Sequence, residues 1–390
     1  MLHIINAYLK PITSPDIPCG ELLIDEGKIV AIGEKVNAPE GCEVFDAQGM
    51  LVCPGFIDAH THIGLHEESV RWEGADYNEV SGPVTPEMRA IDAINPRDEA
   101  FRVALSGGVT TACTGPGSAN VIGGTFTAIK LHGDNVDDMI LREAVAMKIA
   151  MGENPKGCYG QQGKKTPVTR MAIAALLRGT LAKAKKYAAD IALADAENKG
   201  SSTHSSRPFD FQMEAMLPVI NREIPLKAHV HRADDILTVL RVCKEFDVDV
   251  TLDHVTEGHL IVDKLVAAGK PVLVGPSFGS KSKFELKEKS FETPGILAKA
   301  GLDVCIITDA PVIPLNYLPL CAGLAMREGM AEDAAWKAIT INPAKVAGIA
   351  DRVGSLEVGK DADIAVWCGD PLKDIQARAK QVFVNGQAVL

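Results

Sequence analysis

Two pairs of histidines are the first residues in the chain that could do chemistry. His60 and His62 stand two positions apart in PGFIDAHTHIG, and His229 and His231 have the same spacing in LKAHVH. Residues i and i+2 of a strand project to one side, so each pair could direct two imidazoles at one ion. With ten histidines in 390 residues, one such pair can arise by chance. The spacing alone therefore predicts little.

The position of these residues strengthens the prediction of a metal site. Each pair lies at the end of a short apolar run, and three more candidates end such runs in the same way. Imidazole and carboxylate are ligands that Zn²⁺ prefers, and a site with one open position can activate water. The candidate ligands are His60, His62, Glu153, His229 or His231, His254 and Asp309.

The elements that would position these ligands alternate along the middle of the chain. Helical patterns separate most of eight short apolar segments, at 51–60, 108–114, 125–133, 144–153, 226–231, 249–254, 271–276 and 303–309. Such alternation predicts an α/β fold with a parallel sheet, and eight strands are the number that closes a TIM barrel, (β/α)8. The strand ends would then meet at one mouth. A doubly wound open sheet is the alternative, although no G-x-G-x-x-G follows any of the segments.

Both ends of the chain have a different pattern, of short strands separated by turns. Asn385-Gly386 near the C-terminus is a hairpin signal, and Gly27 is another near the N-terminus. Neither end is long enough for a stable sheet alone. We therefore predict one small β-sandwich composed of residues 1–53 and 346–390, with a barrel of residues 54–345 inserted between them.

Two long connections, 64–95 and 154–225, follow the first and fourth predicted strands. Long insertions at this face of a barrel cover the site where chemistry occurs. We expect substrate contacts from residues in or near them. Tyr159 and Arg170 could bind a carboxylate of the substrate, and His204 and His231 are further candidates. Lys130 on the third strand could point into the mouth or extend its ammonium group to the surface.

The overall composition argues against some classes of binding partner. Forty Lys and Arg against 51 Asp and Glu give a formal charge of −11, which argues against nucleic acid or an anionic membrane as partner. The sequence shows no apolar stretch long enough for a membrane span and no signal peptide. Nine cysteines without a C-x-x-C pair indicate free thiols in a reducing cytoplasm. We expect a cytoplasmic protein that acts on a small molecule.

Several of these segments together resemble the amidohydrolase superfamily, over nearly the full length of the chain. The resemblance rests on PGFIDAHTH, LDH, TDAP and the C-terminal NPAKVAGIADRVGSLEVGKDADIAVW. MGENPK and HVHRADDI, with DHVTEGH, are most similar to the imidazolonepropionase-like branch, which itself resembles prolidase-type enzymes.

The resemblance implies roles for the candidate ligands. His60 and His62 match the first-strand ligands of one metal, and His254 matches the sixth-strand ligand. His229, rather than His231, falls where the fifth-strand ligand stands. Asp309 matches a carboxylate that ligates metal and accepts a proton from bound water.

The fourth strand is where the chain departs from the family pattern. Many members bridge two metals with a carboxylated lysine on this strand. Lys148 is expected to lie too far back along it, so Glu153 is the candidate for that role. The resemblance therefore implies one or two divalent metals, with Zn expected and Mn, Fe, Co or Ni as alternatives. Family habit also implies a homo-oligomer.

The implied reaction is hydrolysis of a C–N bond in an amide, a cyclic amide or a dipeptide. Metal-bound hydroxide would attack the carbonyl carbon, with Asp309 as general base and then general acid. One alternative is a heterocycle deaminase on the same scaffold, which Arg232 disfavours because many deaminases have a Glu there. Another is a non-catalytic, dihydropyrimidinase-like scaffold protein. Such relatives lose ligands, whereas every expected ligand type is present here.

Overall fold

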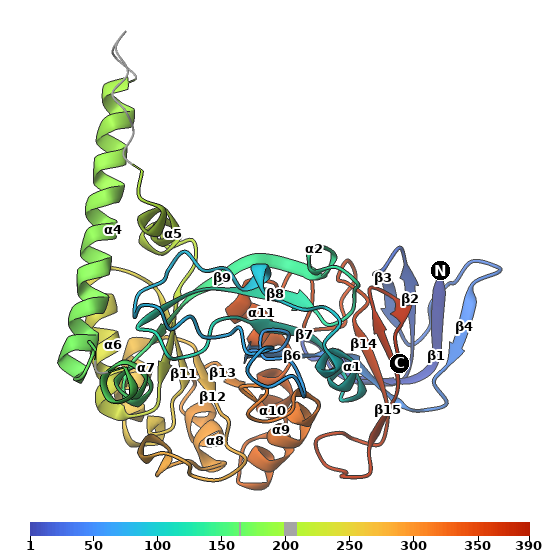
Figure 1. The fold of residues 1–390 in the computed structure, drawn as a ribbon. Coiled ribbons are helices and arrows are strands. Elements are labelled where there is room, and N and C mark those ends of the chain that lie inside the picture. Colours follow the sequence, from blue (N-terminus) through green and yellow to red (C-terminus); the bar gives the residue numbers. More distant parts are fainter. Residues whose placement is uncertain (164, 199–208) are drawn as a thin grey trace.

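An eight-stranded sheet occupies the centre of the molecule (Figure 1). The computed structural model describes residues 1–163, 165–198 and 209–390, so His204 lies outside the described residues. The strands of this sheet, in the order in which they lie side by side, are β6 (Phe56–Thr61), β7 (Val109–Thr114), β8 (Ile122–Lys130), β9 (Ile140–Ala150), β10 (Leu226–Val230), β11 (Val250–His254), β12 (Val272–Val274) and β13 (Val304–Ile306).

The sheet is nearly closed into a barrel. The first and last strands, β6 and β13, lie against each other without a continuous ladder between them. Side-chain and backbone bonds connect these two edges instead. The carboxylate of Asp58 accepts bonds from the backbone N (2.8 Å) and the Oγ1 (2.6 Å) of Thr308, and the backbone N of His62 donates to the carbonyl of Ala310. The eight predicted strands and the barrel-like α/β fold are therefore confirmed.

Strand β8 corrects the prediction of an all-parallel barrel, because it runs antiparallel to both β7 and β9. Only residues 115–121 connect β7 to β8, too few for the crossover that parallel strands require. The reversal places Lys130 at the end of the barrel away from the mouth. There its Nζ lies 2.7 Å from Asp361 and 2.9 Å from Asp363. Of the two alternatives for Lys130, the one in which it points into the mouth is wrong.

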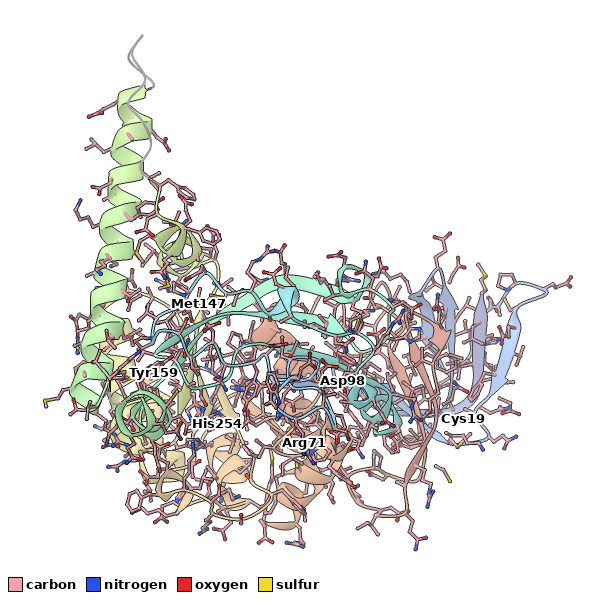
Figure 2. All side chains as sticks on the ribbon, in the orientation of Figure 1. Cys19, Arg71, Asp98, Met147, Tyr159 and His254 are labelled. Atoms are coloured by element: carbon pink, nitrogen blue, oxygen red, sulfur yellow. The ribbon has the colours of Figure 1, made fainter. Side chains whose placement is uncertain are left out.

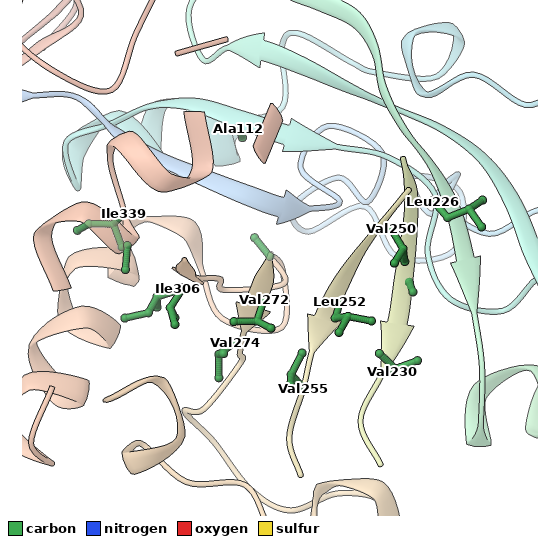
Figure 3. Close-up of a cluster of buried hydrophobic side chains, with 14 of the residues drawn as sticks. Ala112, Leu226, Val230, Val250, Leu252, Val255, Val272, Val274, Ile306 and Ile339 are labelled. Carbon is green, nitrogen blue, oxygen red and sulfur yellow. The ribbon is translucent and has the colours of Figure 1, made fainter. Parts of the chain in front are cut away.

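Helices pack around the barrel and on the loops at its ends. Along β10, apolar Leu226, Ala228 and Val230 alternate with Lys227 and His229, and the apolar set joins the buried core (Figure 3). The polar set is left for the barrel interior. The helices are α1 (Glu99–Ser106), α2 (Val136–Met139), α3 (Glu153–Pro155), α4 (Arg170–Asn198), α5 (Phe211–Ile220), α6 (Ala233–Phe246), α7 (Val262–Ala268), α8 (Glu292–Lys299), α9 (Leu318–Arg327), α10 (Glu332–Ala338) and α11 (Ile341–Ala347).

Both ends of the chain contribute to a second sheet. Its hydrogen-bonded order is β16-β15-β14-β5-β1-β2-β3, with β4 paired to β1, and its junction is the antiparallel pair β5–β14. This is one connected sheet with its own buried core; a sandwich of two sheets is not confirmed. The strands are β1 (Leu2–Leu9), β2 (Ile17–Asp25), β3 (Lys28–Gly33), β4 (Glu43–Asp46), β5 (Leu51–Pro54), β14 (Ile364–Cys368), β15 (Arg378–Val384) and β16 (Gln387–Ala388).

Helices α4 and α5 project from the barrel as a long arm (Figure 1). They pack on each other, and the hydroxyl of Tyr187 on α4 donates to the Oε1 of Glu214 on α5 at 2.5 Å. Among the helices that the structure describes, none combines the length and the apolar character needed to cross a membrane.

Candidate metal centre

Three histidines present the same ring nitrogen to the centre of the barrel mouth. The Nδ1 of His60 lies 2.5 Å from the Oδ2 of Asp253. The Nδ1 atoms of His62 and His254 each lie 2.7 Å from a backbone carbonyl, of Gly115 and Gly275 respectively. Because carboxylate and carbonyl oxygens only accept, each Nδ1 carries the proton and each Nε2 keeps its lone pair. Such partners are typical of histidines that bind metal through the other nitrogen.

The free nitrogens converge on Asp309. Its Oδ1 lies 3.3 Å from the Nε2 of His62 and 3.5 Å from the Nε2 of His60. His254 belongs to two groups whose ligand atoms lie within 4.8 Å of one another, one with His60 and Asp309 and one with His229 and His231. The Nε2 of His254 is buried and has no hydrogen-bond partner among the described residues. An unpaired buried lone pair between two such groups fits a bound divalent metal.

The protonation states of these histidines and of Asp309 also suit metal binding. Burial lowers the pKa of His254 to about 4, and it lowers the pKa of His60 and His229 well below the ordinary value. Burial on its own would raise the pKa of Asp309, but the neighbouring His254 and His62 outweigh it and bring this pKa to about 2. At neutral pH the site therefore offers uncharged imidazoles and an ionised carboxylate, the forms that bind metal.

Lys148 contradicts the expectation that it lies too far back along its strand. Its Nζ lies 3.0 Å from the Nε2 of His60, and the residue is fully buried. The side chain of Lys148 points into the barrel, and its four-carbon stem brings the amine up to the histidines. Burial lowers the pKa of this amine to about 8. A fourth-strand lysine therefore does reach the candidate metal centre.

Glu153 is not brought into either group of ligands. The chain turns at Gly152, which has a φ of 75°, and Glu153 then opens the short helix α3. The backbone N of Glu285 donates to its Oε2 at 3.3 Å, while its own backbone N donates to the Oε1 of Glu285 at 2.5 Å. The turn at Gly152 thus directs Glu153 towards the loop after β12.

The predicted substrate contacts have different outcomes. His231 joins His229 and His254, and its Nδ1 lies 2.8 Å from the Oγ1 of Thr256. The structure therefore brings both histidines of the second pair to the centre, and the choice of His229 over His231 as ligand stays a prediction.

Tyr159 and Arg170 are both held by other protein groups. The Tyr159 hydroxyl, buried near the barrel mouth (Figure 2), donates 2.6 Å to the Oδ1 of Asn120, and burial raises its pKa to about 12. The Nε of Arg170 lies 3.0 Å from both carboxylate oxygens of Asp235. The Tyr159 hydroxyl is therefore bonded within the protein, and the Arg170 guanidinium faces the carboxylates of Asp235 and Glu285.

Two residues beneath the centre were missed by the reasoning from sequence. Asp253 bonds to His60, and the Nζ of Lys227 lies 2.8 Å from the same Oδ2 atom of Asp253. All three side chains are buried. The signal was present in the sequence: Lys227 precedes His229 by two positions, and Asp253 lies on a buried strand where only a partnered charge is tolerated.

Comparison with known proteins agrees with this geometry. The model of the amidohydrolase family matches residues 51–389. The chain belongs to this family. A crystal structure of an amidohydrolase from Thermotoga maritima MSB8 is 40% identical, and it covers the whole of both chains with a TM-score of 0.96.

Curated relatives point to the same part of the family. An imidazolonepropionase of Rhizorhabdus wittichii is 26% identical over 94% of this chain and 91% of its own length. Amidohydrolase tasK of Hapsidospora irregularis is 29% identical over 95% of this chain. The chain spans only 40% of the length of tasK. The resemblance to imidazolonepropionase-like amidohydrolases is thereby confirmed.

Proposed function

We propose that this amidohydrolase is a metal-dependent enzyme that hydrolyses a C–N bond in an amide or cyclic amide of a small molecule. The observation that carries the proposal is the convergence of three Nε2 lone pairs and the Asp309 carboxylate in one buried site. Buried titratable groups with such fixed partners are typical of active sites.

The proposed ligands divide between two adjacent metal positions. His60, His62 and Asp309 would hold one ion, and His254 with His229 or His231 would hold a second. When bound, a divalent metal supplies Lewis-acid chemistry, which polarises a carbonyl oxygen and makes water more acidic. Zn suits these ligand types, and Mn, Fe, Co and Ni also accept them.

We propose Lys148, in place of Glu153, for the fourth-strand position. As an ammonium group it adds a positive charge beside the ligands, which opposes cation binding. Its lowered pKa of about 8 makes the neutral amine accessible near neutral pH. The amine can add to the carbon of CO2 and release a proton, which yields an anionic carbamate with two oxygen donors. This change reverses the sign of the charge next to His60.

Asp309 is the proposed proton carrier. Its carboxylate is ionised at neutral pH and lies beside two histidine ligands, where an attacking water would have to be placed. It can accept the proton of that water and deliver it to the leaving nitrogen. Arg232 cannot take the role of a deaminase acid, because it donates to Asp234 at 2.9 Å and remains charged. Hydrolysis at an amide carbonyl is therefore favoured over hydrolytic deamination of a heterocycle.

The test is a hydrolysis screen with the protein loaded separately with Zn, Mn, Fe, Co and Ni. Hydantoins, imidazolones, N-acyl amino acids, and Xaa-Pro and Xaa-Arg dipeptides are the substrates to compare. We expect metal-dependent opening or cleavage of at least one class, and its loss in Asp309→Asn. Ammonia release from a heterocycle instead would support the deaminase alternative. No turnover with any metal would contradict the proposal.

A further inference from the structure

Lys283 is a cation at the barrel mouth with spare hydrogen-bonding capacity. It lies in the loop after β12, and 22% of its side chain is exposed. Its Nζ donates to the Oδ1 of Asn154 at 2.8 Å, which is its sole hydrogen bond within the described ranges. The nearest carboxylate oxygen, Oε2 of Glu285, is 3.5 Å away and forms an ion pair without a hydrogen bond. Two of the three donors of the ammonium group remain for a ligand.

Asn154 connects this cation to the metal centre. Its Nδ2 lies 3.3 Å from the Nε2 of His229 and 2.6 Å from the Oγ of Ser118. Ser118, Asn154 and Lys283 follow β7, β9 and β12, three strands whose carboxyl ends face the mouth. A single side-chain amide thus separates the ammonium group from a proposed metal ligand. Ser118, Asn154 and Lys283 are called the rim cluster below.

The loop that carries Lys283 is held in place by a second lysine. The Nζ of Lys289 donates to three backbone carbonyls, of Phe278, Gly279 and Ser280, at 2.8–3.0 Å. The placement of Lys283 beside the site is therefore built into the loop.

We propose that the rim cluster is a subsite for a carboxylate of the substrate, with Lys283 as its cationic partner. This inference rests on the proposed hydrolase function, and it narrows the substrate to amides or cyclic amides that carry a carboxylate close to the scissile bond. The role expected of Arg170 passes to Lys283, because Asp235 and Glu285 already engage the Arg170 guanidinium. Charge-assisted bonds from Lys283 and the Ser118 hydroxyl would orient the carboxylate.

The experiment compares two substrates that differ in the anionic group, such as hydantoin-5-acetic acid and 5-ethylhydantoin. The wild-type protein, loaded with its most active metal, should prefer the acid. In Lys283→Met the ratio of kcat/KM for acid over neutral substrate should fall about 10- to 100-fold, mainly through KM of the acid. Lys283→Arg should retain most of the preference, since the cation is kept.

The matched control is Lys287→Met, in the same loop. Lys287 is exposed, and its Nζ lies 5.1 Å over the ring of Phe284. This variant should keep the wild-type ratio. A ratio that is unchanged in Lys283→Met, or that falls equally in Lys287→Met, would overturn the subsite.

Binding separates this inference from the proposed function. Calorimetric titration of hydantoin-5-acetate into the metal-loaded protein measures the subsite without turnover. Weaker binding to Lys283→Met, with no hydrolysis by any form, would keep the subsite and reject the hydrolase. Hydrolysis with equal binding to both forms would keep the hydrolase and reject the subsite.

Discussion

The Nζ of Lys148 lies 3.0 Å from the Nε2 of His60, inside the barrel and away from solvent. An ammonium group in this place donates to a nitrogen that a metal ligand must keep free. The contact therefore indicates that Lys148 must lose its positive charge before a cation binds beside it. Glu153, which follows the end of the same strand and a turn at Gly152, has no such contact.

The first prediction compares these two residues. Lys148→Met should lower metal content and reduce kcat/KM by more than about 100-fold, above the 10- to 100-fold typical of groups that only orient ligands. Glu153→Gln is the matched control and should keep the metal, because its carboxylate bonds to the loop after β12. Elemental analysis and steady-state kinetics measure both. Metal loss in Glu153→Gln, with full metal content in Lys148→Met, would instead support Glu153 as the fourth-strand ligand.

The second prediction concerns Asp309. Asp309→Asn should leave most of the metal in place, since three or more histidine nitrogens remain. It should reduce kcat by about 10²- to 10⁴-fold, because an amide cannot accept the proton of water. Metal content and kcat are measured on the same preparation. Full activity in this variant would exclude Asp309 as the proton carrier.

The third prediction concerns Asp253, which fixes the tautomer of His60. Asp253→Leu should weaken metal binding about 10- to 100-fold. It should also destabilise the fold by about 3–5 kcal/mol, because Lys227 would keep a buried charge without its partner. Chelator competition measures the affinity, and denaturant unfolding measures the stability.

A double variant separates the two effects of Asp253. Asp253→Leu with Lys227→Met removes both charges, so most of the lost stability should return while the metal affinity stays low. Recovery of the affinity together with the stability would mean that Asp253 acts on the fold alone.

The fourth prediction is a pH window for the folded protein. The pKa of His254 is lowered to about 4 in the folded state, from an ordinary value of 6.5. Between these values the unfolded chain binds more protons than the folded one, so the free energy of unfolding contributed by His254 falls as pH falls from 6.5 to 4. The imidazole itself stays neutral, and able to bind metal, down to about pH 5.

Dialysis at a series of pH values measures how much metal is retained, and thermal unfolding measures the stability of the metal-free protein. Metal retention should persist at pH 5.5 and be lost near pH 4. If the stability of the metal-free protein did not fall between pH 6.5 and pH 4, burial would not depress the pKa of His254.

The candidate ligands could be predicted from the sequence because their placement depends on local patterns, such as the alternation of side chains along a strand. His60 and His62 share a side of their strand, and His254 and Asp309 end apolar runs that only a barrel brings together. Strand-end position and residue type follow from alternation along the chain, so the sequence by itself determined the family, the eight strands and these ligand candidates.

Other features depend on distances across the barrel, which no local pattern contains. The short connection after β7, residues 115–121, reverses β8 and sends Lys130 to the far end of the barrel. The turn at Gly152 removes Glu153 from the centre, while the side chain of Lys148 reaches it from inside the strand.

Only the tertiary structure decides which charged groups already have partners. Arg170 and Tyr159 looked free in the sequence, yet Asp235 and Asn120 engage them from distant elements. Lys283 looked like one of many loop lysines, yet the closure of the barrel places it one amide away from His229. Residue type determines the chemistry that each side chain can perform. The packing of strands and loops determines which side chains keep donors or acceptors for a ligand.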